Sequence, residues 1–360
     1  MEKENMERFK SKIILDDIAR IIQKLGDKIE RLENKSFLIT GANGMLPSYM
    51  VYVLTRLNDI YFKDKCKIYV LTRNKILDND RLGYSLKRDD VVQITVDVSQ
   101  PFTFNYPVDF IIHAASKASP KHYLQHRLDT IFANVNGTII LLEYARKNPI
   151  ESFLYFSSAE IYGTPDINNI PTPEDYIGRV SHLNNRSCYV ESKKFAETLC
   201  MNYFWEFGIP VKIVRPSHIF GPEISLDDGR VIADFINNGL NGQNIKLLSR
   251  GTATRTFCDL SDATIAFFLV LLADYNGEVF NIGNDSGEIS MKSLAEMMVK
   301  LFDYKIKVEM PEKEQTDYIV ESPERSCVSI DKIRKKLGYN PEITLEECLK
   351  KIIAYHKEKM

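Results

Sequence analysis

FLITGANGMLPSYMV (residues 37–51) begins as an apolar, β-branched run and ends as a helical one, with a glycine turn between them. Glycines in such a turn let backbone N–H groups approach a pyrophosphate at the positive end of the helix. The third glycine of the usual GxxGxxG pattern is replaced by Pro47, which the first turn of a helix accommodates. The stretch therefore predicts a dinucleotide-binding turn. Its predicted cofactor-binding residues are Gly41, Asn43, Gly44, Met45 and Leu46.

Short apolar runs separated by helix-length segments continue after this stretch. They cover residues 36–40, 67–72, 91–96, 110–113, 153–157 and 211–214. Strands that alternate with helices imply right-handed βαβ units and a parallel sheet. The sequence thus predicts an α/β fold, a Rossmann-type doubly wound parallel sheet with a smaller C-terminal substrate-binding lobe. Ligands of such sheets bind outside the carboxyl ends of the strands.

Three segments follow from changes in this pattern. Residues 1–34 have apolar positions at helical spacing, which predicts a helical N-terminal extension packed on the core or on a neighbouring subunit. Residues 35–215 form the predicted NAD(P)-binding Rossmann domain. Loops, a helix at 232–240 and scattered prolines follow, so residues 216–360 predict mainly a substrate-binding lobe, partly interleaved with the Rossmann domain.

Composition limits the partners and the location of the protein. The 360 residues carry 47 basic and 49 acidic side chains, a net charge of -2, which does not favour nucleic acid or an acidic membrane surface. The most apolar stretch, residues 265–273, falls short of the roughly 20 residues that span a bilayer. The mixed-charge N-terminus does not resemble a secretory signal, so we expect a cytoplasmic protein. Six cysteines without paired spacing predict reduced thiols and no metal site.

Later strands end in further candidate cofactor residues. The second strand is followed by Arg73 instead of the acidic residue that would bind the adenosine ribose, and this favours NADP because Arg can pair with a 2′-phosphate. An enzyme that recycles its cofactor internally can hold either form, so Arg73 does not decide between them, and the expected cofactor is NAD with NADP as an alternative. Asp97 after the third strand could accept a bond from the adenine amino group. The small residues after the fourth strand let the backbone come close to the cofactor. The predicted set is Arg73, Asp97, Val98, Ala114, Ala115, Ser116, Asn134 and Pro216, with Tyr189 and Lys193.

The segment YVESK places Tyr189 and Lys193 on one face of a helix, one turn apart. An unperturbed phenol has a pKa of about 10, too high for a base at neutral pH. A nearby ammonium and a nicotinamide cation stabilise the phenolate, as the oxidation of a hydroxyl requires. Ser158 follows the fifth strand and can share the proton of the reacting hydroxyl. These three residues form the predicted catalytic triad.

Five stretches of this chain resemble the extended short-chain dehydrogenases/reductases that modify nucleotide sugars. They are HAASKASPKHY (113–123), RSCYVESKKFAETL (186–199), VRPSHIFGP (214–222), DDGRV (227–231) and TRTFCDLSD (254–262). Within the NAD-dependent epimerase/dehydratase family they look most like UDP-glucuronate decarboxylases. The resemblance covers residues 35 to about 339.

The resemblance implies that bound cofactor oxidises the sugar at C4, with Tyr189 as base assisted by Ser158 and Lys193. In a glucuronate the resulting ketone is β to the C6 carboxylate, which makes loss of carbon dioxide easy. Glu160 matches a family glutamate that handles a proton near C5 or positions the sugar. The substrate-binding residues implied are Lys117, Arg186, His218, Arg230, Arg255 and Arg325, with Ser326 as the alternative to Arg325 if the alignment shifts by one residue.

Other reactions stay open. A nucleotide-sugar 4-epimerase fits Ala159 but not Glu160, a 4,6-dehydratase would need Asp at position 159, and a C4 dehydrogenase would release reduced cofactor. A catalytically inactive binding or regulatory protein has its best support in the missing third glycine, and the intact triad argues against it. The resemblance further implies a homodimer formed by the helices that carry the YxxxK motif, a UDP-linked sugar and a role in polysaccharide biosynthesis.

Overall fold

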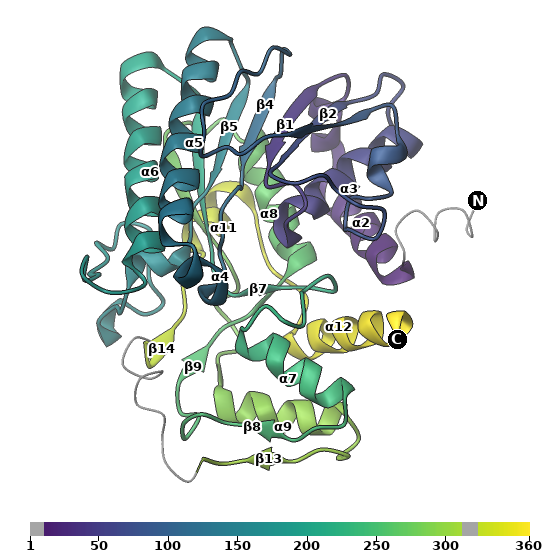
Figure 1. Cartoon of the computed structure of the whole chain (residues 1–360), viewed down its shortest axis with the longest axis vertical. Coiled ribbons are helices and arrows are strands. Elements are labelled where there is room, and N and C mark those ends of the chain that lie inside the picture. Colours follow the sequence, from purple (N-terminus) through teal and green to yellow (C-terminus); the bar gives the residue numbers. More distant parts are fainter. Residues whose placement is uncertain (1–10, 312–322) are drawn as a thin grey trace.

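The computed structural model describes residues 11–311 and 323–360, so the first ten residues of the predicted extension lie outside the described part. Its centre is a seven-stranded parallel sheet in the order β11-β6-β5-β4-β1-β2-β3 (Figure 1). The strands are β1 (Ser36–Thr40), β2 (Lys67–Thr72), β3 (Val91–Thr95), β4 (Phe110–His113), β5 (Ser152–Phe156), β6 (Val211–Pro216) and β11 (Glu278–Ile282). The six predicted strands are confirmed to within two residues at each end.

Helices cover both faces of the sheet, because its side chains alternate between two cores. In β1, Phe37 and Ile39 belong to one core and Leu38 to the other. The long helices are α3 (Met45–Ile60), α5 (Arg127–Lys147), α6 (Ser187–Phe207) and α8 (Leu260–Leu272). α5 and α6 lie side by side over the Leu38 core, whereas α3 and α8 pack in the other. The predicted doubly wound fold is therefore confirmed.

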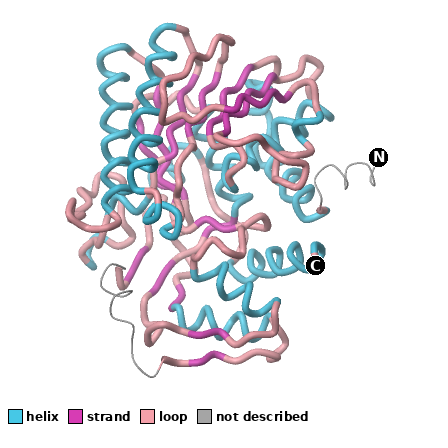
Figure 2. Tube along the Cα trace, viewed as in Figure 1, coloured by secondary structure: helices cyan, strands magenta, loops and turns pink. Residues whose placement is uncertain are grey.

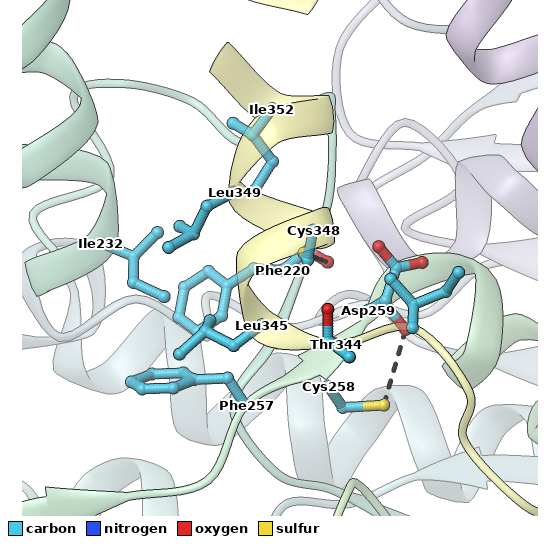
Figure 3. A pocket seen from close by; sticks show the side chains of 11 residues that line it. Phe220, Ile232, Phe257, Cys258, Asp259, Thr344, Leu345, Cys348, Leu349 and Ile352 are labelled. Carbon is cyan, nitrogen blue, oxygen red and sulfur yellow. Dashed lines mark hydrogen bonds between the residues drawn. The ribbon is translucent and has the colours of Figure 1, made fainter. Parts of the chain in front are cut away.

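A smaller lobe with its own apolar core lies below the carboxyl edge of the sheet (Figures 1 and 2). Its helices are α7 (Val231–Leu240), α9 (Met291–Leu301) and α12 (Leu345–Lys359), and α7 matches the predicted helix at 232–240. Figure 3 shows Ile232 of α7 and Phe220 against Leu349 of α12. The chain does not stay in this lobe after residue 216, since β11 returns to the sheet beside β6.

Short elements complete the described chain. They are α4 (Pro120–Gln125), β7 (Ile219–Phe220), β8 (Ile245–Lys246), β9 (Thr254–Arg255), β10 (Cys258–Asp259), β12 (Ile289–Ser290), β13 (Val308–Glu309), β14 (Arg325–Ser326), α11 (Asp331–Leu337) and the 3-10 turns η1 (Gly26–Leu32), η2 (Ser85–Lys87), η3 (Ala159–Tyr162) and η4 (Ile167–Asn169). Of these, β7 pairs with β10, and β9 lies between β12 and β14.

The N-terminal extension forms helix α2 (Lys12–Leu25), which begins at the capping side chain of Ser11. Its buried face carries Ile14, Ile18, Ile21, Ile22 and Leu25, which join the core with α3 and α8. The sequence left two possible packing partners for this helix, the core of its own chain or a neighbouring subunit. In the structure it packs on the core of its own chain.

The apolar stretch at 265–273 is the buried middle and end of α8, a helix of 13 residues. Among residues 11–311 and 323–360, no helix is both long enough and apolar enough to cross a membrane. All six cysteines are free thiols, and five of them are buried.

Candidate active site

The glycine turn joins β1 to α3 and closely approaches the end of β4. Gly41 has φ of 65°, and a Cβ on it would lie 2.7 Å from the Cα of Ala115. Gly44 is the N-cap residue of α3 and has no side chain to accept a hydrogen bond. The N–H groups of the first helical turn, which include those of Met45 and Leu46, therefore have no side-chain cap. A close backbone approach beside uncapped helical N–H groups fits a dinucleotide pyrophosphate.

The polar groups beneath this turn organise the end of β4. The Thr40 hydroxyl bonds to Nδ1 of His113 at 2.7 Å and accepts the N–H of Ala115 at 3.1 Å. The buried Oγ of Ser116 has no hydrogen-bond partner among the described residues, which leaves it available to a ligand. Asn43 is already engaged, because its Oδ1 accepts the N–H of Leu82 at 3.2 Å.

Residues after β2 and β3 form the predicted adenosine end of the site. Arg73 is half-exposed and lies 3.7 Å from Asp129, whose carboxylate also contacts Lys117 at 3.3 Å. Asp97 accepts the N–H of Ser99 at 2.9 Å. Burial opposes ionisation of Asp97, but hydrogen bonds from Ser99 and the charge of Arg73 lower its pKa overall. Val98 beside it is buried.

The YxxxK pair lies on α6 at the carboxyl ends of β4 and β5. Nζ of Lys193 donates to the carbonyl of Phe156 at 2.6 Å and lies 6.0 Å from the centre of the Tyr189 ring. It also lies 4.9 Å from the ring of Tyr155. Burial lowers the pKa of Lys193 to about 7, although Glu197 opposes the shift. The amine of Lys193 is thus held near the phenol ring, next to the end of the fifth strand, and a negative charge on the phenol would favour its protonated form.

Tyr189 is almost fully buried, and its surroundings favour the protonated phenol. Burial and the charge of Glu160 raise the pKa of Tyr189, whereas a hydrogen bond from the Ser158 side chain and the charge of Arg230 act in the opposite direction. Ser158 also caps η3, accepting the N–H of Glu160 at 3.2 Å. In the free chain Tyr189 therefore keeps its proton at neutral pH.

Tyr123 of α4 joins these groups and was not among the predicted site residues. Its buried ring stacks on Tyr189 with centroids 5.1 Å apart and an interplanar angle of 8°. Its hydroxyl donates to Oε2 of Glu160 at 3.4 Å, and Arg186 donates to the same oxygen at 3.1 Å. No spacing in the sequence marks Tyr123, because its partners lie 37 and 66 residues away. The one signal was its position at the end of the HAASKASPKHY stretch.

Asn134 and Pro216 flank this arrangement. Nδ2 of Asn134, on α5, donates to Oγ of Ser192 on α6 at 2.9 Å, and its buried Oδ1 has no hydrogen-bond partner in the described chain. Pro216 is the last residue of β6. Both stay predicted cofactor ligands.

His218 follows β6 at the same edge of the sheet, in the left-handed conformation with φ of 45°. Burial and the charges of Arg255 and Arg230 lower its pKa to about 3, so the imidazole is neutral. Its Nε2 lies 3.1 Å from Oγ of Ser326. Arg230 influences the pKa of both His218 and Tyr189, which places the two predicted residues around one region.

The candidate arginines differ in their partners. Arg230 lies 3.0 Å from Asp228, and buried Arg255 donates to the carbonyls of Thr254 at 2.7 Å and Pro323 at 2.6 Å. Arg325 forms a two-pronged pair with Glu288, with Nε and one terminal nitrogen at 2.7 and 2.8 Å. Neighbouring residues of a strand point to opposite sides, so Ser326 and not Arg325 meets His218.

Comparison with known proteins places these features in a family. Residues 37–283 match the model of the NAD dependent epimerase/dehydratase family. The chain is 34% identical to UDP-glucuronic acid decarboxylase 5 of Arabidopsis thaliana, over 88% of this chain and 87% of that protein. It is 29% identical to UDP-glucuronic acid decarboxylase 1 of Xenopus tropicalis, over 95% of this chain and 81% of that protein.

Solved structures show the same fold. The epimerase Mth375 of Methanothermobacter thermautotrophicus superposes with a TM-score of 0.79 at 21% identity, over 92% of this chain and 95% of that one. UDP-glucuronic acid 4-epimerase of Bacillus cereus in complex with NAD gives a TM-score of 0.73 at 20% identity, over 90% and 97%.

Proposed function

This chain belongs to the NAD-dependent epimerase/dehydratase family, and from that premise we propose that it oxidises the C4 hydroxyl of a nucleotide-linked sugar with bound NAD. The observation that carries the proposal is the meeting of Ser158, Tyr189 and Lys193 at the edge of the sheet that holds the glycine turn. The sugar nucleotide we propose is UDP-glucuronate, and the product a UDP-pentose. The names of the relatives that align over most of the chain support this choice.

The first step needs a base beside C4. NAD, when bound, accepts the hydride from C4 and brings a positive charge that favours the phenolate form of a nearby tyrosine. Ser158 and Tyr189 would hydrogen-bond the C4 hydroxyl, and Tyr189 would take its proton. Lys193 would stabilise the phenolate from below. The turn at Gly41 and the start of α3 would hold the pyrophosphate.

The second step uses the ketone at C4. The C5–C6 bond breaks, carbon dioxide leaves, and the electron pair is delocalised onto the C4 oxygen as an enolate. A proton must then reach C5. The carboxyl group of Glu160 would pass this proton to C5. Arg186 and Tyr123 hold the carboxyl group in place, because both donate to its Oε2. Tyr189 would then give its proton back to the C4 oxygen as the hydride returns to C4, which would complete the pentose.

A second candidate is a nucleotide-hexose 4-epimerase, which the substrate region favours on one observation. Arg325 is paired with Glu288, so its charge is already matched. The group that meets His218 is the neutral hydroxyl of Ser326. A sugar without a carboxylate would suit this pair.

Chromatography that resolves sugar epimers, coupled to mass spectrometry, separates the candidates after incubation with UDP-glucuronate and UDP-glucose. We expect UDP-glucuronate to lose one carbon dioxide, with no net consumption of NAD. An isomer of unchanged mass from UDP-glucose would establish the epimerase instead. Loss of water or of two hydrogens would point to a dehydratase or a dehydrogenase. If no sugar nucleotide changes, the proposed function is wrong.

Tyr123→Phe should lower kcat about 10-fold, because the variant loses the hydrogen bond to Glu160 but keeps the ring stacked on Tyr189. Tyr123→Leu removes the stacking as well and should lower kcat further. Steady-state kinetics on UDP-glucuronate measure both. A Tyr123→Leu variant with full activity would show that the ring does not orient Tyr189.

We further propose a cytoplasmic homodimer that uses α5 and α6. Exposed apolar side chains on these helices support a second copy as the partner, since Leu128, Phe132 and Phe195 are 64%, 41% and 51% exposed. The six free cysteines fit a reducing compartment. NAD is the cofactor of the proposal, and exposed Arg73 leaves room for the 2′-phosphate of NADP. A role in polysaccharide biosynthesis stays part of the proposal.

A further inference from the structure

Helix α2 lies where the main domain meets the smaller lobe (Figure 1). Its apolar face packs against α3 and α8 of the main domain. Its polar side chains contact the last segment of the chain, which includes α12. Because α12 packs through Cys348, Leu349 and Ile352 in the core of the smaller lobe, α2 touches both parts of the molecule.

The central contact is a buried group of three charges. Nζ of Lys351, on α12, lies 2.6 Å from Oδ1 of Asp17 on α2 and 2.9 Å from Oδ2 of Asp259 on β10. The carboxylate side chains of Asp17 and Asp259 are 6% and 0% exposed. Tyr49 of α3 donates to the second oxygen of Asp17 at 3.2 Å. One ammonium therefore ties three separate segments together.

Asp259 connects this group to the substrate region. It caps α8 by accepting the N–H of Ser261 at 2.8 Å, and it pairs with Phe220 in the β7–β10 ladder. The preceding residue, Cys258, donates its N–H to the carbonyl of His218 at 3.1 Å. Figure 3 shows Asp259 beside α12, with Phe220 across the same junction. A shift of Asp259 would move β7, the strand that directly follows His218.

A second set of contacts fixes the segment before α12. Arg20 of α2 lies 2.5 Å from Asp262 and 3.3 Å from Glu342, and Lys24 lies 2.5 Å from Glu342. Asp262 also accepts the N–H groups of Glu342 and Ile343, both at 2.9 Å. The entry into α12 is thus held from the same helix.

The charged groups of Asp17, Lys351 and Asp259 contribute more to the geometry of the fold than to the free energy of unfolding. Burial and the neighbouring charge of Asp259 raise the pKa of Asp17 to about 6, although Lys351 opposes the shift. The folded chain thus favours a neutral side chain at position 17 more than water does, whereas the two carboxylates raise the pKa of Lys351 and favour its charged form. A buried ion pair of this kind is weak evidence for stability, and geometric specificity is one reason such pairs are kept.

We propose that Asp17 is a positioning residue, which through Lys351 and Asp259 sets the placement of the smaller lobe and of His218 over the sugar site. The inference rests on the proposed function, since it concerns the binding of the sugar nucleotide. The glycines of the proposed NAD-binding turn make none of the contacts described above, although Tyr49 of α3, the helix that follows the turn, donates to Asp17.

The test compares Asp17→Asn with the control Asp16→Asn, which removes an exposed carboxylate one residue away. Asp17→Asn should raise KM for the sugar nucleotide about 5- to 10-fold and change kcat less than about twofold. The Kd for NADH, followed by its fluorescence, and the Tm should stay at wild-type values. Asp17→Glu should recover part of the KM, because it restores the charge. Asp16→Asn should match the wild type throughout.

An unchanged KM in Asp17→Asn would overturn the inference. So would a joint loss of NADH affinity, KM and Tm, which would indicate general loosening of the fold. Failure of the proposed function looks different, because the wild-type chain itself would then convert no sugar nucleotide.

Discussion

Replacing Tyr189 by phenylalanine is expected to lower kcat about 1000-fold while leaving the fold intact. The change removes only the phenolic oxygen, and the ring keeps its stacking on Tyr123. Without that oxygen the triad keeps only the Ser158 hydroxyl, which is too weak a base to take the C4 proton, and Lys193, whose Nζ donates to the carbonyl of Phe156. Single-turnover measurement of NADH formation with UDP-glucuronate isolates this step.

Tyr339→Phe is the matched control. Tyr339 is also buried, and its hydroxyl donates to the carbonyl of Gly283 at 3.1 Å, outside the triad. Its loss should cost about 1 kcal/mol of stability and leave kcat near wild type. If Tyr189→Phe kept more than a tenth of the wild-type rate, another group would have to be the base.

The sheet could be predicted because each of its first six strands is a short apolar run followed by a helix-length segment. β11 was missed for a physical reason. Its sequence EVFNI contains a polar Asn281, and it joins the sheet by pairing with β6 about 66 residues away. The residue pattern of a short segment does not show which distant strand it will pair with. The other strands follow one another in βαβ units, which a local pattern can indicate.

The site shows the same division. Tyr189 and Lys193 are one helical turn apart, so their shared face follows from the spacing. Tyr123 comes from a separate short helix, and only the fold brings its ring onto Tyr189. Sequence similarity also left Arg325 and Ser326 as alternatives, because a shift of one residue exchanges the two sides of a strand. The structure brings the Ser326 hydroxyl to His218 and pairs Arg325 with Glu288, and which of the two matches the family arginine stays a prediction.

The second large effect is expected for Lys193→Met, which should lower kcat about 100-fold. Methionine fills similar space but brings no charge beneath Tyr189, so the phenolate loses its stabilising partner. Steady-state kinetics on UDP-glucuronate give kcat. Lys212→Met is the control, because Lys212 is also buried and has a pKa lowered by burial to about 8, but it contacts Ser152 and Leu271. Lys212→Met should keep the wild-type kcat.

The same two variants differ from the wild type in the pH dependence of unfolding. Burial lowers the pKa of Lys193 from 10.5 to about 7 in the folded chain. Between these values the unfolded state binds a proton that the folded state does not, so the free energy of unfolding rises with pH, by at most about 1.4 kcal/mol per unit for this group. Below pH 7 both states are protonated and this slope vanishes. Urea titrations of the cofactor-free protein at several pH values give this free energy. In both variants it should rise less steeply with pH than in the wild type. Loss of kcat in Lys193→Met alone would then separate the charge beneath Tyr189 from the general effect of burying a lysine, whereas equal losses in both would contradict the role given to Lys193.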